Sequence, residues 1–573
     1  MQSTTKNSRT RSVMSGFTTP AGVALALAVA ISPASAVASP AKSPWPPPPA
    51  KGTFYIHYGE EHPDDADGPR IFSQVISETA RYRPSLVTTS GDKGDDNAVE
   101  SLMRWKQMME LYDRKGIPYF AAVGNHDRSP KGSSGIGSAV NGGSIGNYLD
   151  IFADRPFPFG DAAPPSDPRF SPSTRPAADP AGASTHYAFE YGPVRYVVLD
   201  NSCFSFTTCD SYQSPGFAAG EDTYSFLAAE AATAEASGDL LFVVMHMPTQ
   251  DDRPGHTEPT PSAHTMGEGS APDNAAFEQA ATAAGVDAVL LGHVKGQFEY
   301  VAGGVPYYTD GGAGGEVYVG DGEETGVDYG YWHGYRLITV RRGKIAYTDT
   351  VPIFEPGGIT VAGPAKLGSG AIGQFSAIGR QPTENGPAVE SLALREPDPA
   401  RPNASKLPTP ARIWRSSDPL VLAPVAAQND DPRRNRRRET ISGRFRARCP
   451  GKTTVKVKSG WEQRRFAVTV PSAAGRLVRS IDGGASLRRG ERTTVARVRL
   501  AQDARVRVRI RAGGRTIRRL VDRCQQAGRR LAARWDGRRA NGKAVSPGKY
   551  QVSIQVLSER SPRAERFPVR VRR

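Results

Sequence analysis

Short apolar runs alternate with stretches of helical periodicity from about residue 51 to residue 354. Five of these runs predict buried strands: Phe54–Ile56, Leu86–Val87, Tyr119–Val123, Leu241–Val244 and Ala288–Leu291. Between them, apolar residues recur at helical spacing, for example within Ile71–Ile76 and Val99–Trp105. Strands that alternate with helices in this way predict a layered α/β domain, which we bound at residues 51–354.

The helical pattern stops near residue 356, and strictly alternating runs take its place. Thr454–Lys458 and Phe466–Val470 predict two-faced strands, and in Arg505–Ile510 apolar residues alternate with arginines. These patterns predict two all-β domains, at residues 355–472 and 473–573. Turn-forming residues at Trp535–Gly537 and Asn541–Gly542 predict that the final strands pair with each other around a turn.

The first 38 residues have the features of a secretory signal peptide. Three basic residues precede the apolar stretch Val23–Ile31, which is too short to span a bilayer, and small residues follow at Ala34–Ala38. Residues 39–50 include the run Pro46–Pro49 and predict a stiff linker. No second apolar segment of spanning length occurs, so we expect a secreted protein without a transmembrane segment.

Residues 128–185 interrupt the α/β pattern with abundant Gly, Ser and Pro. This insertion directly follows a polar signature at residues 124–127, so it is placed either to cover a substrate as a lid or to form a surface loop. Four cysteines are compatible with export, where disulfides persist. Cys203 and Cys209 are close enough in sequence to pair locally, in which case Cys449 and Cys524 form a longer bridge or stay free; all three connectivities remain open.

The net charge of +15 hides two halves of opposite sign. Residues 431–573 carry 41 Lys and Arg against 10 Asp and Glu, a balance of +31, whereas residues 1–430 have a balance of −16. A basic tail attracts polyanions, and in an exported protein we expect anionic wall polymers such as teichoic acids or phosphorylated glycans. Nucleic acid is disfavoured because the tail has few aromatic residues for base stacking. The alternative is that arginine simply occupies solvent-facing strand positions.

Polar signatures follow the five predicted strands, and each occurs once and in order. They are Gly59–His62, Gly91–Asp95, Gly124–Asp127, Met245–His246 and Gly292–His293. Side chains at the carboxyl ends of strands converge on one crevice of an open α/β sheet. Carboxylates, an amide and imidazoles together suit a pair of divalent metals, a recurrent device for hydrolysing phosphate esters.

These signatures resemble those of the calcineurin-like metallophosphoesterases, in their secreted bacterial form, over roughly residues 51–354. The resemblance implies a four-layer α/β sandwich, a phosphate ester substrate and two metals. It assigns metal ligation to Glu60, His62, Asp92, Asn125, His246 and His293, with Asp92 bridging both metals. It places His126 over the leaving group, makes Asp127 the orienting partner of His126, and matches Asp95 to the second acid of the GDxxD motif.

Two departures from the family pattern affect the first metal site. The first acid is Glu60 instead of Asp, and the last ligand of the GHxH motif is replaced by Lys295. A protonated ammonium has no lone pair and cannot ligate a metal. The first site then keeps Glu60, His62 and Asp92, so we expect one or two divalent metals, with Mn, Fe and Zn all suited to the ligands. The alternative is that Lys295 supplies the positive charge that a second metal would otherwise supply.

Two further resemblances concern the C-terminal half. Residues 413–419 and 449–455 resemble bacterial Ig-like repeats, and residues 535–543 with 547–550 resemble the FlgD-type Ig-like domain. The sequence thus predicts a secreted metal-dependent phosphoesterase followed by two Ig-like domains. The alternative is a catalytically weakened, wall-associated binding protein on the same scaffold. The remaining histidines match no motif position and are interpreted as structural or surface residues: His57, His186, His256, His264 and His333.

Overall fold

The structure is a computed structural model. It describes residues 53–63, 68–94, 98–127, 146–152, 173–174, 186–202, 222–250, 271–315, 317, 330–383, 386–393, 412–425, 439–440, 443–558 and 563–573. The predicted signal peptide, the linker, Asp95, the pair Cys203 and Cys209, most of the 128–185 insertion, and His256 and His264 lie outside these ranges. Within them, no helix is both long enough and apolar enough to cross a membrane.

A five-stranded sheet carries the first three predicted strands. Its order is β12-β11-β1-β2-β3, with β1 (Thr53–Tyr58), β2 (Leu86–Thr89), β3 (Tyr119–Ala121), β11 (Gly334–Val340) and β12 (Ile345–Pro352). β1, β2 and β3 run parallel, so their carboxyl ends lie at the same edge. β11 pairs antiparallel with β1, which brings residues near 335 back beside the start of the domain.

A seven-stranded sheet carries the other two predicted strands. Its order is β4-β5-β6-β7-β8-β10-β9, with β4 (Ser173–Thr174), β5 (Tyr187–Glu190), β6 (Val194–Val198), β7 (Leu240–Val244), β8 (Ala288–Leu291), β9 (Gln297–Ala302) and β10 (Val305–Asp310). β6, β7, β8 and β10 run parallel to one another, whereas β5 and β9 pair antiparallel with β6 and β10. All five strands predicted from the apolar runs are therefore confirmed, within one to two residues at their ends.

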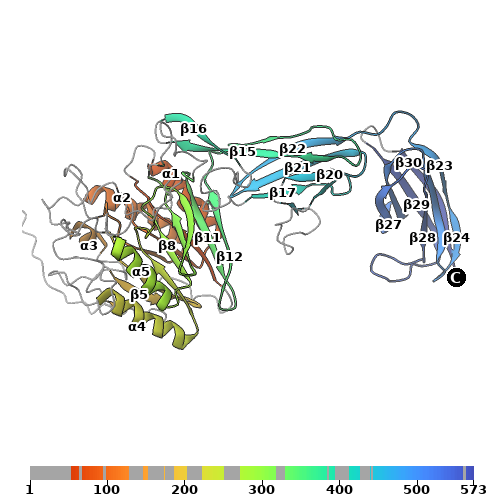
Figure 1. Cartoon of the computed structure of the whole chain (residues 1–573). Helices are drawn as coiled ribbons and strands as arrows, with labels where there is room; N and C mark the ends of the chain where they lie inside the picture. Colours follow the sequence, from red (N-terminus) through yellow and green to blue (C-terminus); the bar gives the residue numbers. More distant parts are fainter. Residues whose placement is uncertain are drawn as a thin grey trace, which may run out of the picture. The chain divides into compact units, whose positions relative to one another are not determined.

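The two sheets pack face to face, and helices cover their outer sides (Figure 1). The core between the sheets joins residues of both, such as Phe120 of β3 and Phe189 of β5, whose rings stack with centroids 3.8 Å apart. α1 (Gly68–Tyr82), α2 (Val99–Lys115) and α3 (Gly146–Phe152) pack on the first sheet. α4 (Asp222–Ser237) and α5 (Ala271–Ala283) pack on the second, so the predicted layered α/β domain has four layers.

α1 and α2 form where the apolar periodicity predicts helices. In α1, the adjacent pairs Ile71–Phe72 and Val75–Ile76 lie one turn apart on one face of the helix and are buried. α2 ends at Gly116, whose left-handed conformation (φ 63°) suits a residue without a side chain. The basic residues of its last turn, Arg114 and Lys115, complement the negative end of the helix dipole. Local sequence thus marks the buried face of α1 and the end of α2.

In the part of the chain after residue 356 that the structure describes, the regular elements are all strands, as the alternating pattern predicts. Residues 359–470 form three small sheets, ordered β13-β15-β16, β14-β20-β18 and β19-β17-β21-β22. Their strands are β13 (Ile359–Ala362), β14 (Ile372–Gln374), β15 (Ser376–Thr383), β16 (Gly386–Ala393), β17 (Arg412–Ser416), β18 (Leu422–Pro424), β19 (Glu439–Thr440), β20 (Arg444–Ala447), β21 (Gly451–Ser459) and β22 (Glu462–Val470). One apolar core, centred on Trp414, joins these sheets.

Residues 478–572 form two further sheets around a separate core. Their orders are β23-β25-β28 and β24-β30-β29-β26-β27. The strands are β23 (Val478–Gly483), β24 (Ala485–Arg488), β25 (Thr493–Leu500), β26 (Ala504–Ala512), β27 (Arg515–Gln525), β28 (Arg530–Trp535), β29 (Gly548–Leu557) and β30 (Arg563–Arg572). The predicted pairing around the turn at 535–542 is wrong in its partners, because β28 pairs with β25 and β29 pairs with β26 and β30.

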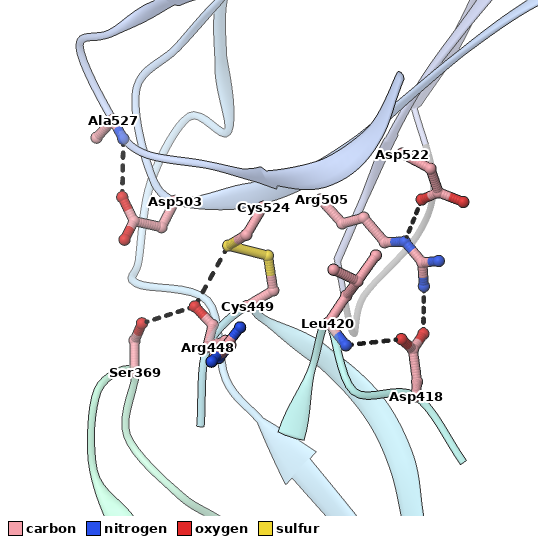
Figure 2. The surroundings of a disulfide bond; sticks show 10 residues. All are labelled: Ser369, Asp418, Leu420, Arg448, Cys449, Asp503, Arg505, Asp522, Cys524 and Ala527. Carbon is pink, nitrogen blue, oxygen red and sulfur yellow. Dashed lines mark hydrogen bonds and ion pairs between the residues drawn. A yellow bond between two sulfur atoms is a disulfide. The ribbon is translucent and has the colours of Figure 1, made fainter. Parts of the chain in front are cut away.

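A disulfide joins Cys449, which follows β20, to Cys524 of β27 (Figure 2). Of the alternatives that the sequence left open for these two cysteines, the longer bridge is the one formed. Arg505 lies beside the bridge and forms ion pairs with Asp522 and Asp418 (Figure 2). The bridge therefore ties residues of the two all-β segments together covalently.

Candidate metal centre

The predicted ligands lie at the carboxyl ends of adjacent strands from both sheets. Residues after β1, β2 and β3 come from the first sheet, and residues after β7 and β8 come from the second. Backbone hydrogen bonds join these loops in pairs. Glu60 N, after β1, donates to Gly91 O, after β2 (3.2 Å), and Gly292 N, after β8, donates to His246 O, after β7 (2.9 Å). The two facing sheet edges therefore bring side chains separated by more than 230 residues into one place.

Four of the predicted ligands have strained backbones. Among the described residues, six that are not glycine have positive φ, and four of these are Glu60, His62, Asp92 and His293, with φ between 31° and 65°. Residues with side chains rarely adopt this left-handed region, which costs about 1–3 kcal/mol each. Such strain persists where the surrounding structure enforces it and is concentrated at functional sites. Here it turns successive polar side chains towards one centre.

The glycine that precedes Asn125 is required by close packing at Asp92. A Cβ on Gly124 would lie 2.0 Å from Oδ1 of Asp92 and 2.3 Å from its backbone nitrogen, so no larger residue fits. Gly91, at φ +104°, lies equally close to the backbone of Gly124. The two glycines allow the loops after β2 and β3 to touch, which places Asp92 between the loop after β1 and the loop after β3.

Two trios of buried side chains could hold metal ions, and they share Asp92. In the first, Glu60, His62 and Asp92 offer ligand atoms that all lie within 4.8 Å of one another. Nε2 of His62 lies 3.3 Å from Oε2 of Glu60 and 3.6 Å from Oδ2 of Asp92. These three ligands are those expected to remain in the first metal site after the loss of the ligand at position 295.

The second trio consists of Asp92, His246 and His293. Nε2 of His246 lies 3.2 Å from Oδ2 of Asp92 and 3.2 Å from Nδ1 of His293. Oδ1 of Asn125 lies 2.7 Å from the same Nε2. The structure thus brings all six predicted ligands together, in the two groups that the family resemblance implies, with Asp92 common to both.

The tautomer of His246 shows that this cluster suits a cation. Nδ1 of His246 lies 2.8 Å from the carbonyl oxygen of Ser90, which can only accept, so Nδ1 carries a proton. In the neutral ring the lone pair is then on Nε2, and it faces the acceptor oxygen of Asp92. Lone pairs that converge in a buried site repel unless a proton or a metal lies between them. Carboxylate and imidazole donors of this kind suit a divalent metal.

The pKa values of His246 and Asp92, in the second trio, are shifted because their acceptor atoms face one another. Burial opposes protonation of His246, but the Asp92 and Glu60 carboxylates outweigh it and raise the pKa of His246 to about 9. Burial likewise opposes the charge on Asp92, yet the neighbouring His246 and His126 hold the pKa of this carboxyl well below its usual range. Without a metal, a proton on His246 supplies the positive charge that Asp92 requires.

The first trio has the same character, with an added influence from Lys295. Burial and the charge of Lys295 both act to lower the pKa of His62, but hydrogen bonds to Asp92 and Glu60 raise it well above its usual range. Lys295 is half-buried and lies near enough for its charge to act on this ring. The ammonium of Lys295 therefore lies near the first trio. At this sequence position the family pattern has a further metal ligand.

His126 and Asp127 differ in how they lie. The backbone nitrogen of His126 donates to Oδ1 of Asp92 (2.9 Å), and its ring lies 5.2 Å from that of His62 and is partly exposed. The Asp127 carboxylate is fully buried and accepts from the backbone nitrogens of Gly124, Asp92 and Lys93. It thereby clamps the loops after β2 and β3, while its predicted action on His126 stays a prediction.

Two residues that support the candidate metal centre are not among those predicted from the sequence. Lys93 is fully buried and donates from Nζ to Oδ2 of Asp127 (3.0 Å) and to the carbonyl of Ala122 (2.7 Å). Its ammonium also lies over the ring of Tyr148, 4.8 Å from the centroid. It occupies a variable position of the GDKGD signature, where nothing in the local pattern distinguishes it from a solvated lysine.

The second residue is Asn201, in the loop after β6. Its Oδ1 accepts from the backbone nitrogens of His246 (2.9 Å) and Met247 (3.0 Å), and its Nδ2 donates to the Met247 carbonyl (2.9 Å). The polar residues Asp200–Ser202 directly follow an apolar strand, which is the same signal that identified the ligands. A side chain with all these bonds fixes the backbone from which His246 projects.

The family model described as calcineurin-like phosphoesterase matches residues 56–296. This stretch forms a calcineurin-like phosphoesterase domain. The match includes all six predicted ligands and ends one residue beyond Lys295. No curated protein matches the chain.

Several solved structures are similar to the phosphoesterase domain at low identity. A purple acid phosphatase from yellow lupin (Lupinus luteus) seeds is 14% identical with a TM-score of 0.35, and the match covers 61% of this chain and 54% of that chain. A dimetal phosphatase from Danio rerio is 13% identical with a TM-score of 0.32, covering 53% of this chain and 99% of that one. PhoD is 10% identical with a TM-score of 0.37, covering 61% and 70%. The chain thus spans about half the length of the lupin enzyme.

Proposed function

We propose that the protein is a secreted, metal-dependent phosphoesterase that hydrolyses phosphate mono- or diesters. The observation that carries the proposal is the pair of buried trios that share Asp92, inside a domain of the calcineurin-like phosphoesterase family. Bound divalent metals supply a Lewis acid for the phosphoryl oxygens and a hydroxide near neutral pH. The suited ions are Mn, Fe or Zn, because carboxylate, amide and imidazole donors are all present.

The residues of the two trios and their neighbours would have different roles in this reaction. Glu60, His62 and Asp92 would hold one ion, and Asp92, Asn125, His246 and His293 would hold the other. His126 would protonate or stabilise the leaving oxygen, because its ring is partly exposed beside the buried trios. Asp127 and Lys93 would hold the loops in place. Asp95, which lies outside the described residues, is retained as a catalytic prediction from the family motif.

We propose unequal occupancy of the two trios. The second trio gains a fourth ligand from Asn125, whereas the first has three ligands and a neighbouring ammonium, that of Lys295, which opposes a cation. One tight ion at Asp92, Asn125, His246 and His293 and a weaker one at Glu60 and His62 follow from this difference. The charge of Lys295 would then take over part of the role of the weaker ion towards a phosphate.

Secretion is proposed from the signal-like first 38 residues and from the cysteines, two of which form a disulfide. The basic segment 431–573 supports attachment to anionic polymers outside the cell. The rival function, a binding protein on a weakened phosphoesterase scaffold, was raised by Glu60 and Lys295. It is not favoured, since the glutamate offers carboxylate oxygens within reach of His62 and Asp92.

The deciding experiment assays the purified full chain against generic phosphomonoesters and phosphodiesters with Mn, Fe or Zn. We expect activity with at least one metal and its loss in Asp92→Ala, because this carboxylate belongs to both trios. Glu110→Ala, an exposed change on α2, is the matched control and should keep full activity. If no metal gives activity, or if Asp92→Ala keeps full activity, the proposal that the protein is a hydrolase is wrong. A chain that retains no metal after dialysis against Mn or Zn would favour the rival.

A further inference from the structure

One face of the C-terminal five-stranded sheet concentrates positive charge. Along β26, Val506, Val508 and Ile510 are fully buried, so the alternate residues Arg505, Arg507, Arg509 and Arg511 all lie on the opposite, outward face. Along β30, Val569 and Val571 are buried in the same core, and Arg566, Arg570 and Arg572 lie on the outward face. Two rows of arginine thus follow the two strands that flank β29.

Between these rows, β29 presents neutral polar side chains. Val552, Ile554 and Val556 face the core, so Gln551, Ser553 and Gln555 lie on the opposite face of β29. Gln551 is exposed and Gln555 is half-buried, whereas Ser553, between its arginine neighbours, is only 5% exposed. The register places Ser553 directly between Arg509 of β26 and Arg566 of β30. We call this strip the polar lane, defined by Gln551, Ser553 and Gln555 and its flanking arginines. Neighbouring strands are about 4.8 Å apart, so the arginine rows lie about 10 Å from each other across it.

The positive charge of this face is poorly compensated. In the described part of the face, Asp522 of β27 pairs with Arg505 (2.6 Å), Arg507 (3.2 Å) and Arg519 (3.5 Å), and Arg505 also pairs with Asp418. Compensation is therefore concentrated at the Arg505 end of the β26 row. Arg509 lies directly opposite Arg519 on the neighbouring strand. Like charges in this position destabilise a sheet pair. Burial, followed by the charges of Arg507 and Arg519, lowers the pKa of the Arg509 guanidinium.

A stability cost of this kind is expected where a surface is built for an anion. Guanidinium groups bind phosphate oxygens through two parallel hydrogen bonds, and alternate positions along a strand repeat about every 7 Å. The exposed amide of Gln551 suits hydroxyl groups between the charges. Among the described residues of this face there is no aromatic side chain on which bases could stack, because Tyr550 and Phe567 pack towards the core. These features fit a polymer of alternating phosphodiesters and hydroxylated units.

We propose that the polar lane binds an extended phosphodiester-linked polyol polymer. The arginines of β26 and β30 would bind its phosphates from the two sides of the lane. The inference rests on the proposed attachment to anionic polymers and is independent of the proposed hydrolysis. It assigns the binding to one face of one sheet, whereas a general effect of net charge would distribute it over the whole basic segment.

The test compares two triple variants of the full chain with equal loss of charge. Arg509→Gln, Arg566→Gln and Arg570→Gln remove charge from the lane. Arg497→Gln, Arg499→Gln and Arg534→Gln, exposed on β25 and β28 of the other sheet, remove the same charge elsewhere. Binding to poly(glycerol phosphate) is measured in chelator at low salt, with neutral dextran as the blank. We expect the lane variant to bind about tenfold more weakly and the control to change less than about twofold.

Equal weakening in both variants, or none in either, would overturn the lane and leave only net charge or an absence of binding. Tighter binding of single-stranded polydeoxythymidine than of poly(glycerol phosphate) would overturn the polymer class in favour of nucleic acid. Thermal melting of both variants excludes unfolding as the cause. Hydrolysis of a small soluble phosphate ester is followed in parallel; if all proteins lack it, the proposed function fails while the binding result stands.

Discussion

The ammonium of Lys93 lies 3.0 Å from Oδ2 of Asp127, and both side chains are fully buried beneath the candidate metal centre. The same carboxylate accepts hydrogen bonds from the backbone of Gly124 and Asp92. One ion pair therefore holds the loops after β2 and β3 in contact. It links the stability of the fold to the placement of the carboxylate that both metal trios share.

Replacing this lysine should be costly. Lys93→Met leaves the Asp127 charge buried without its cationic partner, and breaking such a pair ordinarily costs about 3–5 kcal/mol. Urea unfolding of the phosphoesterase domain, followed by circular dichroism, measures the loss. Arg114→Met, which removes the exposed pair with Glu110, is the control and should cost less than about 1 kcal/mol. Equal effects of the two variants would contradict the role given to Lys93.

Asn201 should control metal affinity without being a ligand. Asn201→Ala removes three hydrogen bonds to the backbone at His246 and Met247, which frees the His246 ring to move. Loss of a group that orients a ligand ordinarily weakens metal binding about 10- to 100-fold. Competition with a fluorescent chelator measures this. Gln250→Ala is the control, because its amide bonds to Glu278 in the same region. An unchanged affinity in Asn201→Ala would refute the positioning role.

Lys295 should limit the occupancy of the first trio. Lys295→His replaces a repelling ammonium with a group that has a lone pair, so we expect a second ion per chain to be retained after a chelator challenge. Elemental analysis counts the ions, and the exposed Lys344→His serves as the control. If the unaltered protein already keeps two ions equally well, the proposed inequality of the two trios is wrong.

His57 should make the fold sensitive to acid. It is fully buried on β1, where burial and Arg336 outweigh its hydrogen bonds with Leu291 and Thr88 and lower its pKa to about 3. In the unfolded chain the ring titrates near 6.5. The folded state therefore binds fewer protons, so this contribution to stability is present above pH 6.5 and is lost as the pH falls from 6.5 towards 3.

The measurement for His57 is the melting temperature between pH 3 and pH 7, in the native chain and in His57→Gln. We expect the curve of the variant to be flatter over this range, because glutamine does not titrate. Both chains share all their carboxylates and the other histidines, so the acid titration of those groups cancels in the comparison. Parallel curves would show that His57 is not responsible for the acid sensitivity.

The Cys449–Cys524 bridge should stabilise the all-β segments selectively. It spans a sequence separation of 75 residues, and closing a loop of this size is ordinarily worth about 4 kcal/mol. Cys449→Ser combined with Cys524→Ser should lower the calorimetric transition of these segments and leave that of the phosphoesterase domain in place. Reduction of the native protein should give the same shift. A shift of the phosphoesterase transition instead would contradict the assignment of the bridge.

Much of the phosphoesterase domain could be predicted from the sequence, because its signals are local. Five apolar runs mark the buried strands, and the polar residues that follow each run mark the ends where ligands gather. Asp92 and His246 are recognisable for this reason, although 153 positions separate them. The alternation of Arg507 with Val508 likewise identifies a two-faced strand without any knowledge of its neighbours.

Only the tertiary structure decided which strands are neighbours. The turn-forming residues after Trp535 suggest a hairpin, yet β28 and β29 pair in different sheets, because pairing depends on the apolar faces of distant strands. The same holds for Cys449 with Cys524, for Lys93 with Asp127, and for the row that joins Arg509, Ser553 and Arg566. Local sequence determines the conformation of a segment, whereas the partner of a buried charge or a strand edge is determined by the packing of the whole chain.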